Sequence, residues 1–332
     1  MSVAVMAPEG TMHAIGNTKY GSPGGLRLLE VATPALDDDA VLVRVRAASV
    51  NPYDWHVMRG LPYLVRLSEG RRRPKRSVRG VDMAGVVEAV GRNVTQVAPG
   101  DAVYGWGRFG ALAEYERAGE HSCVPKPDGI SFEQAAAIPM AACTALQALR
   151  DKGRLTAGQT VLINGASGGI GTFAVQIAKA LGAEVTGVCS TRNVELVRSL
   201  GADHVIDYAA DDFTRGKRYD LIVDLVGNRS LRALRRALTP KGTFVAVGGG
   251  DGRWIGPLLL PLKALLVSRF VGQRLLPFLA KLNRDDLLFV NELVDDGKLV
   301  PVVDRTYPLS EAPNAIRYLE EGHARGKVVV TT

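Results

Sequence analysis

The sequence TVLINGASGGIGTFAVQIAKALGA occupies residues 160–183 and joins three kinds of local structure in one stretch. The apolar run 161–163 is typical of a buried parallel strand, and a glycine-dense turn follows at residues 165–171. Apolar residues then recur at three- or four-residue spacing up to Leu181, which predicts an amphipathic helix. A glycine turn between a strand and a helix indicates that a dinucleotide binds there.

Each glycine of this turn has a physical role in such a site. Gly168 lets the backbone approach a pyrophosphate, and Gly171 lets the helix pack closely on the sheet. The free N–H groups at the start of the helix attract the anion. Ala166 stands where the usual motif has its first glycine, so the motif is a variant. The candidate cofactor contacts from this turn are Ser167, Gly168, Gly169, Ile170 and Gly171.

The bulk composition favours a globular protein with two domains. The chain has 332 residues, of which 46% are hydrophobic and 23% charged. Its net charge of +7 is compatible with nucleic acid, an anionic surface or a phosphorylated cofactor, and charge alone does not choose among them. The three cysteines form no CxxC pair, which argues against a disulfide framework and a cysteine zinc site and favours a reducing compartment.

No segment predicts secretion or a membrane span, so a cytoplasmic location is expected. The first residues lack a basic segment followed by an apolar run. The most apolar region, Trp254 to Ala280, is interrupted by prolines and charged residues. We expect it to lie in the core, in the roof of a cleft or in a homo-oligomer interface, with membrane-surface contact as the less favoured alternative. The basic run at residues 71–76 is expected to be a solvated loop, with a nucleic-acid patch as its alternative.

The coarse pattern of strands and helices changes near residue 130. Before it, short strands such as Val41–Ala47 lie between glycines and prolines, which suggests a small barrel or sandwich. After it, Ser131 begins an N-cap pattern for an alanine-rich helix that Pro139 breaks. From residue 160 strands alternate with helices, which predicts an α/β fold with a parallel sheet. The expected strands are 161–163, 184–188, 204–207, 221–225 and 243–247, and the expected helices between and after them include 194–200, 230–238 and 284–296. The tail adds a helix at 310–320 and a strand at 327–330, and it is too short for a core of its own.

Six collinear segments resemble one family across nearly the whole chain. The sequence is similar to zinc-independent members of the medium-chain dehydrogenase/reductase superfamily, of the quinone oxidoreductase type. The resemblance implies a GroES-like β-barrel domain at 1–130 and 276–332, and a Rossmann doubly wound parallel-sheet domain at 131–275. The matching segments are ASVNPYD at 48–54, GVDMAGVV at 80–87, PGDAV at 99–103, ACTA at 142–145, the glycine turn, and GHARGKVV at 322–329.

The resemblance also shows where this chain departs from zinc-dependent relatives. Those relatives carry a cysteine near the position of residues 49–51 and a histidine shortly before the segment that starts at Gly80. This chain has no cysteine at the first position and no histidine in 72–75, and it lacks the four-cysteine structural lobe. We therefore expect no metal.

The end of the second strand favours NADP(H) over NAD(H). An NAD-preferring domain has an acidic residue about twenty residues past the glycine turn. Here that region, Val188 to Arg192, contains hydroxyls and a guanidinium and no carboxylate. Arg192 and Ser190 are the candidates for holding a ribose 2′-phosphate, although Arg192 is also compatible with a solvated helix start. The resemblance adds further cofactor contacts at Thr144, Tyr208, Val226, Gly227 and Gly248.

Without a metal, the protein must polarise the acceptor's carbonyl with hydrogen-bond donors. Asn51 and Tyr53 are the candidate catalytic residues, because the resemblance places them in the metal-ligand region beside the nicotinamide. An amide donates without titrating, and a phenol donates a bond and a proton. A plain Asn-Pro turn at Asn51 and a merely covering role for Tyr53 stay open as alternatives.

Together these patterns predict an NADPH-dependent, zinc-independent reductase that acts on a quinone or an α,β-unsaturated carbonyl compound. The alternatives are a metal-free NADP-dependent alcohol dehydrogenase, and an NADPH-binding protein with an RNA- or membrane-surface-binding role. We expect a small-molecule substrate and a homo-oligomer, with a dimer favoured.

Overall fold

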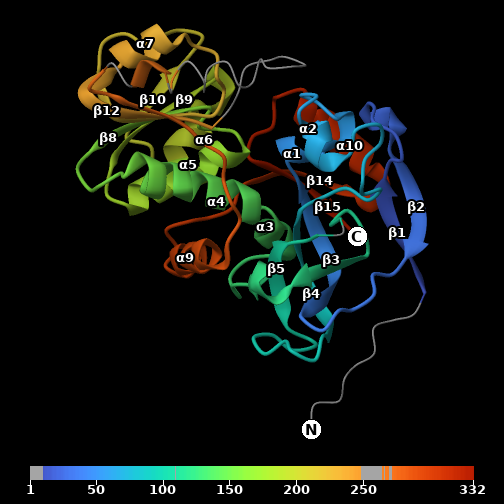
Figure 1. The fold of residues 1–332 in the computed structure, drawn as a ribbon. Coiled ribbons are helices and arrows are strands. Elements are labelled where there is room, and N and C mark those ends of the chain that lie inside the picture. The colour runs from blue at the N-terminus through green and yellow to red at the C-terminus, as the bar shows by residue number, and fades with distance from the viewer. Residues whose placement is uncertain (1–9, 109, 248–263, 265, 269–270) are drawn as a thin grey trace. The chain divides into compact units, whose positions relative to one another are not determined.

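The computed structural model describes residues 10–108, 110–247, 264, 266–268 and 271–332. It comprises two compact units, and each is described by itself (Figure 1). Unit 1 contains Met1–Met140, Leu282–Asp295 and Pro301–Thr332, and unit 2 contains Ala141–Lys281 and Asp296–Val300. The limits at residues 130 and 276 that the sequence suggests remain our proposal for the functional domains.

Unit 1 is built on a seven-stranded sheet with the order β14-β15-β3-β4-β5-β7, in which β6 also pairs with β3. The tail returns to this sheet, as the sequence predicts, because β15 pairs antiparallel with β3 and parallel with β14. A separate antiparallel pair joins β1 to β2. The strands are β1 Thr11–Gly16, β2 Arg27–Ala32, β3 Ala40–Val50, β4 Asp82–Val90, β5 Ala102–Trp106, β6 Tyr115–Gly119, β7 Cys123–Pro125, β14 Val303–Pro308 and β15 Lys327–Thr331. The helices are α1 Pro52–Arg59, α2 Val65–Glu69, α3 Phe132–Ala136, α9 Arg284–Asp295 and α10 Ala312–Glu320, with 3₁₀ turns at Pro23–Gly25, Glu120–Ser122 and Leu309–Glu311.

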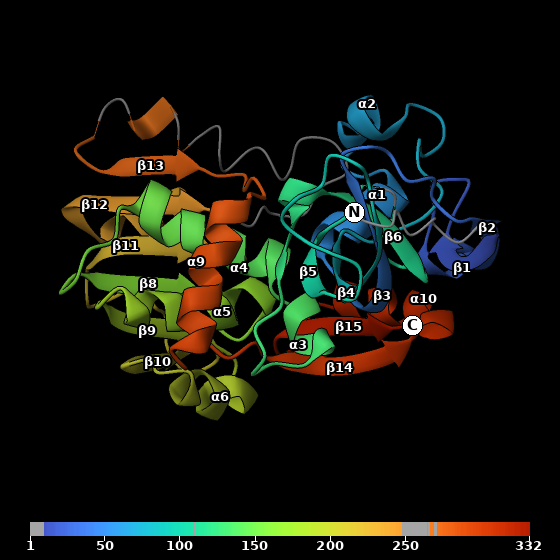
Figure 2. The same ribbon diagram turned by 90° about the horizontal axis from the view of Figure 1, so that it is seen from below.

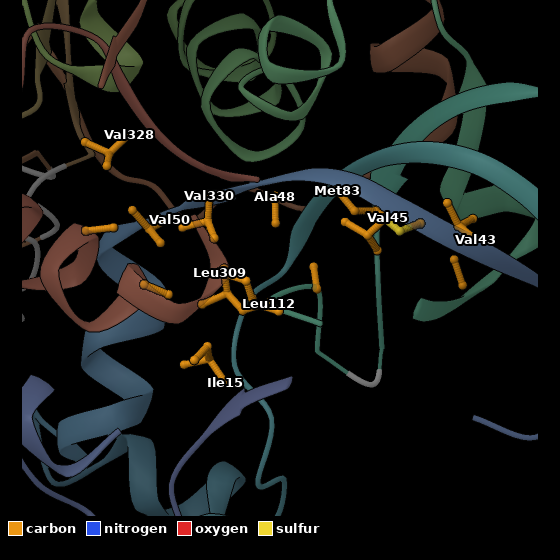
Figure 3. Close-up of a cluster of buried hydrophobic side chains, with 14 of the residues drawn as sticks. Ile15, Val43, Val45, Ala48, Val50, Met83, Leu112, Leu309, Val328 and Val330 are labelled. Atoms are coloured by element: carbon orange, nitrogen blue, oxygen red, sulfur yellow. The ribbon is translucent and has the colours of Figure 1, made fainter. Parts of the chain in front are cut away.

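The core of unit 1 follows from the period-two pattern of β3. Val43 and Val45 are buried, whereas Arg44 and Arg46 between and after them are exposed. This confirms the strand predicted at Val41–Ala47 and shows that it is half-exposed. The inward side chains of β3 meet apolar residues of β4, β15 and the neighbouring turns (Figure 3). Those labelled there are Ile15, Val43, Val45, Ala48, Val50, Met83, Leu112, Leu309, Val328 and Val330.

Unit 2 is a six-stranded parallel sheet with the order β10-β9-β8-β11-β12-β13 (Figure 2). Its first strand, β8, lies in the middle, with the next two strands on one side and the last three on the other. This is the doubly wound order, in which ligands bind where the strand order reverses, beyond the carboxyl ends of the strands. The strands are β8 Thr160–Asn164, β9 Glu184–Cys189, β10 His204–Asp207, β11 Tyr219–Asp224, β12 Leu238–Ala246 and β13 Arg274–Pro277.

The helices of the α/β region follow the predicted pattern closely. Helix α5 packs on β8 and β9, α6 on β9 and β10, and α7 on β12. The helix that begins with α4 continues as a π-helix at Gln147–Gly153, which the sequence pattern does not reveal. The other bounds are α4 Pro139–Leu146, α5 Gly169–Ala180, α6 Val194–Ser199 and α7 Leu231–Arg236, with a 3₁₀ turn at Thr191–Asn193.

The apolar stretch Trp254 to Ala280 lies partly outside the described residues. Within the described part, β13 adds a sixth strand to the parallel sheet, and its Leu275 is buried in the core of unit 2. The sequence pattern gave no strand here. Among the described residues, no helix is both long enough and apolar enough to cross a membrane.

Candidate functional site

The glycine turn lies at the point where the strand order of unit 2 reverses, between β8 and α5. Gly165 has a φ of 89°, a conformation that residues with a Cβ rarely adopt. A Cβ on Gly171 would lie 2.1 Å from the carbonyl oxygen of Gly165. Only glycine therefore allows the first turn of α5 to approach the end of β8 this closely.

The start of α5 has the properties of an anion site. Gly168 is the N-cap and supplies no side-chain cap, so the first N–H groups of this 12-residue helix are not capped by a side chain of that residue. A Cβ built on Gly168 would contact only the carbonyl oxygen of Gly165, at 3.5 Å. The residues present here fit the pyrophosphate of a dinucleotide, which needs close backbone approach and free N–H donors.

The neighbouring strand ends bring the other cofactor candidates to the same edge of the sheet. Ser190 follows β9 and Tyr208 follows β10, and the Tyr208 N–H donates to the carbonyl of Cys189 at 3.1 Å. Arg192 is exposed in the turn after β9, and Tyr208 is 53% exposed. The amide of Asn193 donates to the hydroxyl of Ser167 at 2.9 Å, which ties this turn to the glycine turn.

A carboxylate, Asp207, also lies at this edge, at the end of β10. Hydrogen bonds from Thr191, with one from the Ala209 N–H, lower its pKa. Asp207 therefore stays ionised and holds the turn that carries Arg192. The expected spacing of about twenty residues from the glycine turn leads to the end of the second strand. Asp207 ends the third strand, so this spacing did not predict it.

The loop after β11 is held by a buried carboxylate. Asp224 accepts hydrogen bonds from the N–H groups of Val226 and Gly227, at 3.1 and 2.9 Å, and from the side chain of Asn164 at 2.8 Å. These bonds fix Val226 and Gly227 beside the glycine turn. Of the remaining candidates, Thr144 is buried on α4, and Gly248 lies outside the described residues.

Asn51 lies in unit 1, at the junction of β3 and α1, inside a buried polar network. It is the N-cap of α1, with Pro52 in the first helical position, so the Asn-Pro pair starts a helix. Its side-chain oxygen accepts from the ammonium of Lys327 at 2.5 Å, and its side-chain nitrogen donates to Asp82 at 2.9 Å. The amide orientation is therefore fixed from both ends.

Asp82 and Lys327 form a buried ion pair at 3.7 Å, with side chains 0% and 4% exposed. Asp82 also accepts from the hydroxyl of Ser49 at 3.1 Å and from the Met140 N–H at 3.2 Å. Burial raises the pKa of Asp82 and lowers that of Lys327, and the attraction between the two opposes both shifts. The pair joins β4 to β15 beneath Asn51.

Asp54, on the first turn of α1, is a second buried carboxyl beside this network. It accepts from the Asn51 N–H at 2.7 Å. Burial raises the pKa of Asp54 to about 7, with Asp82 adding to the shift and the Asn51 bond, Lys327 and Arg79 opposing it. A group of this kind exchanges its proton near neutral pH.

The Tyr53 side chain hydrogen-bonds to Glu69 and not to the Asn51 network, so no hydrogen bond joins the two candidate catalytic side chains. Its hydroxyl donates to Glu69 at 3.0 Å, and the residue is 43% exposed. Partial burial, with the Glu69 carboxylate, raises the pKa of Tyr53 to about 12. The phenol therefore keeps its proton at neutral pH and directs it toward Glu69.

Most partners of Asn51 were not predicted from the sequence. Asp82 and Lys327 are charged residues among apolar neighbours on β4 and β15, and that pattern was the available signal. Asp54 three residues after Asn51 was a capping signal. Among the described residues, no group of three or more histidine, cysteine, aspartate or glutamate side chains has an arrangement that holds a metal ion.

Two family patterns match the chain. One, described as an alcohol dehydrogenase GroES-like domain, matches residues 37–128, and the other, described as a zinc-binding dehydrogenase, matches residues 200–330. Their order along the chain agrees with a GroES-like unit followed by a nucleotide-binding unit.

Curated relatives and solved structures match over almost the full length. A chloroplast envelope quinone oxidoreductase homolog of Arabidopsis thaliana is 34% identical over 96% of this chain and 98% of its own. An NADPH-dependent alkenal/one oxidoreductase, chloroplastic, of the same organism is 33% identical over 94% of this chain and 78% of its own. The structure of the quinone oxidoreductase from Coxiella burnetii is 32% identical, with a TM-score of 0.86 over 97% of this chain and 100% of that chain.

Proposed function

Because the chain belongs to the medium-chain dehydrogenase/reductase superfamily, in its quinone oxidoreductase-like branch, we propose that it transfers hydride from NADPH to a quinone or an α,β-unsaturated carbonyl compound. It is an oxidoreductase. The observation that carries the proposal is the glycine turn at the strand-order reversal, with an uncapped helix start that fits a pyrophosphate. The named activities of the relatives supply the class of acceptor.

We assign the cofactor preference to NADPH. Ser190, Arg192 and Tyr208 come from adjacent strand ends and offer a hydroxyl, a guanidinium and an aromatic ring to a 2′-phosphate. The residues directly after β9 include no carboxylate for the ribose hydroxyls of NADH. When bound, the reduced nicotinamide supplies the hydride.

Asn51 is the proposed donor to the acceptor's carbonyl oxygen. One amide N–H of Asn51 donates to Asp82 at 2.9 Å, and the amide nitrogen lies at a long 3.5 Å from the carbonyl of Ser49. Lys327 on the amide oxygen withdraws electron density and makes the N–H that Asp82 does not accept a better donor to the substrate. Asp82 and Lys327 hold the amide in one orientation, so little reorganisation accompanies the build-up of charge on the substrate. Tyr53 is proposed as the second polar contact, with its proton shared with Glu69.

Three further properties belong to the same proposal. The chemistry proceeds without zinc, since polar side chains occupy the region where zinc-dependent relatives place ligands. The protein works in the cytoplasm, which its buried cysteine thiols support, although both relatives described above are chloroplast proteins. It forms a homodimer, which light scattering on the purified protein would test.

A cofactor-oxidation screen tests the function directly. Purified protein is mixed with NADPH and a panel of quinones, enones and enals, and the loss of reduced cofactor is followed by absorbance. We expect turnover with at least one class of acceptor and none with saturated ketones. An alcohol dehydrogenase would instead reduce saturated aldehydes and oxidise alcohols, and no turnover with any acceptor would refute the proposal.

Arg192→Ala tests the cofactor assignment. Loss of a charged contact to the 2′-phosphate should weaken NADPH binding by about tenfold or more and leave NADH binding unchanged. Arg198→Ala is the matched control, because Arg198 is an exposed arginine on α6 that pairs with Glu195. Equal losses for the two cofactors in Arg192→Ala would exclude the 2′-phosphate role.

A further inference from the structure

A small pocket of about 30 Å³ lies in unit 1 beside Tyr53. Its polar lining comes from three places in the chain: Tyr53 and Asp54 on α1, Glu69 at the end of α2, and Arg76 and Arg79 on the loop before β4. Nothing in the proposed chemistry uses the two arginines.

Arg79 is a buried cation without an ion pair among the described residues. It is 4% exposed, its Nε has no hydrogen-bond partner, and one terminal nitrogen donates to the carbonyl of Arg76. Its backbone is fixed by bonds to Ile15 at 2.9 Å and Leu112 at 2.8 Å. A buried guanidinium is costly unless an anion and further hydrogen bonds compensate it, so this one calls for an acceptor.

The nearby acids do not supply that acceptor. Within the described part of the chain, neither Asp54 nor Glu69 forms an ion pair with Arg79, and Glu69 is engaged with the Tyr53 hydroxyl at 3.0 Å. Burial lowers the pKa of Arg79, and the more distant Asp54 and Glu69 oppose that shift. Arg76 adds a second, exposed cation to the pocket lining.

The small volume of the pocket favours a small anionic group. A volume of 30 Å³ accommodates about two or three water-sized groups. The two oxygens of a carboxylate fit this space. Arginine presents parallel N–H donors that match a carboxylate. The candidate catalytic Tyr53 lines the same pocket, so an anion bound here lies beside a proposed substrate contact.

We propose that Arg79, with Arg76, binds a carboxylate of the substrate, so that the preferred acceptors are α,β-unsaturated carbonyl compounds that carry an acidic group. This inference rests on the proposed reductase function and specifies its substrate class. Arg79 is then a specificity-determining residue.

The test compares β-acetylacrylic acid with its methyl ester, an enone pair in which the ester lacks the charge and carries one additional methyl group. For each protein we take the ratio of kcat/KM for the acid to kcat/KM for the ester. The two compounds differ in intrinsic reactivity, but this difference is the same for every variant and cancels when the ratios of two variants are compared. Arg79→Met should lower this ratio by about tenfold or more relative to the wild type. Arg72→Met, an exposed arginine of the same loop that does not line the pocket, should leave it unchanged. An unchanged ratio in Arg79→Met overturns the inference.

A binding measurement separates this inference from the reductase function. Calorimetric titration with levulinate, a saturated keto acid, and with methyl levulinate requires no turnover. We expect levulinate to bind the wild type and Arg79→Met to weaken that binding by about tenfold or more. If Arg79→Met fails to fold, Arg79→Lys keeps the charge without the paired donors and should show a smaller loss. Turnover of uncharged enones without levulinate binding refutes the carboxylate site alone, and levulinate binding without any turnover refutes the reductase function alone.

Discussion

At the scale of single residues, Asp54 makes the stability of the fold depend on pH. Its pKa is about 7 in the folded protein against an ordinary value of 3.8, so the folded state binds more protons between these values. Stability is therefore higher at low pH within this window and falls as the pH rises from about 4 to 7.

Asp54→Asn should remove most of this dependence. The change keeps an oxygen acceptor for the Asn51 N–H and removes the titrating proton. Between roughly pH 5 and pH 8, the wild type should lose about 2 kcal/mol more unfolding free energy than the variant, measured by urea unfolding at each pH. If the unfolding free energies of the wild type and Asp54→Asn depend on pH in the same way, Asp54 is ionised throughout this pH range.

Gly168 and Gly171 form a matched pair for the glycine turn. Gly171→Ala should destabilise the protein by about 1–3 kcal/mol, because its Cβ meets backbone that cannot move away. Gly168→Ala places its Cβ at an ordinary 3.5 Å and at an unstrained φ of −82°, so stability should change by less than about 0.5 kcal/mol.

Gly168→Ala should affect cofactor binding, although it should hardly affect stability. We expect Gly168→Ala to fold normally and to bind NADPH about tenfold more weakly, since the methyl group occupies the space of close backbone approach. Thermal melts and fluorescence titration measure the two effects separately. Unchanged NADPH affinity in a folded Gly168→Ala would mean that the turn serves packing only.

The sequence predicted individual residues well where a local rule governs them. The N-cap at Ser131 is confirmed: its hydroxyl accepts from the Gln134 N–H at 3.2 Å, and Gln134 accepts in return at 3.0 Å. The surroundings of Asn51 were not predictable in this way. Its partners Asp82 and Lys327 are distant in the chain, and only the pairing of β15 with β3 brings them together.

At the scale of elements, β15 contributes a charge as well as a strand. Lys327→Met removes the cation and leaves the carboxylate of Asp82 buried without it, which should cost about 3–5 kcal/mol of unfolding free energy. The double variant Lys327→Met, Asp82→Asn should recover a large part of this loss, because no uncompensated charge remains. Urea unfolding of the single and double variants measures the coupling. Additive losses would mean that the two residues stabilise the sheet independently.

Helices and strands were predicted well where the hydrophobic periodicity was strong. They were missed where the structure depends on contacts between residues that are distant in the chain. The strand at His204–Asp207 has its predicted bounds, and the helix that starts at Arg284 ends within one residue of its expected end. Strand β13 was missed because Arg274–Pro277 is short and lies inside an apolar stretch that prolines and charged residues interrupt, so no alternating pattern marks it. The π-helix after α4 was missed because its residues read as ordinary helix formers, and bonds from Gln147 to Lys281 contribute to that region.

At the scale of the whole molecule, the site proposal makes a prediction about metal content. Prolonged dialysis against a zinc chelator should leave NADPH-dependent activity and the melting temperature unchanged, because the proposed carbonyl donors are amide and phenol groups. Elemental analysis of the purified protein should find far less than one zinc per chain. Stoichiometric zinc, together with loss of activity on chelation, would refute the metal-free mechanism.

The return of β15 to the sheet of unit 1 has a consequence for biosynthesis. Strands β3 and β4 are synthesised before unit 2, but the strand that pairs with β3 and the lysine that pairs with Asp82 are synthesised after it. Unit 2 is complete sooner, so the nascent chain reverses the usual order in which the N-terminal domain folds first. Until then the edge of β3 and the carboxylate of Asp82 stay exposed, and chaperones that hold unpaired strands should associate with the growing chain at this stage.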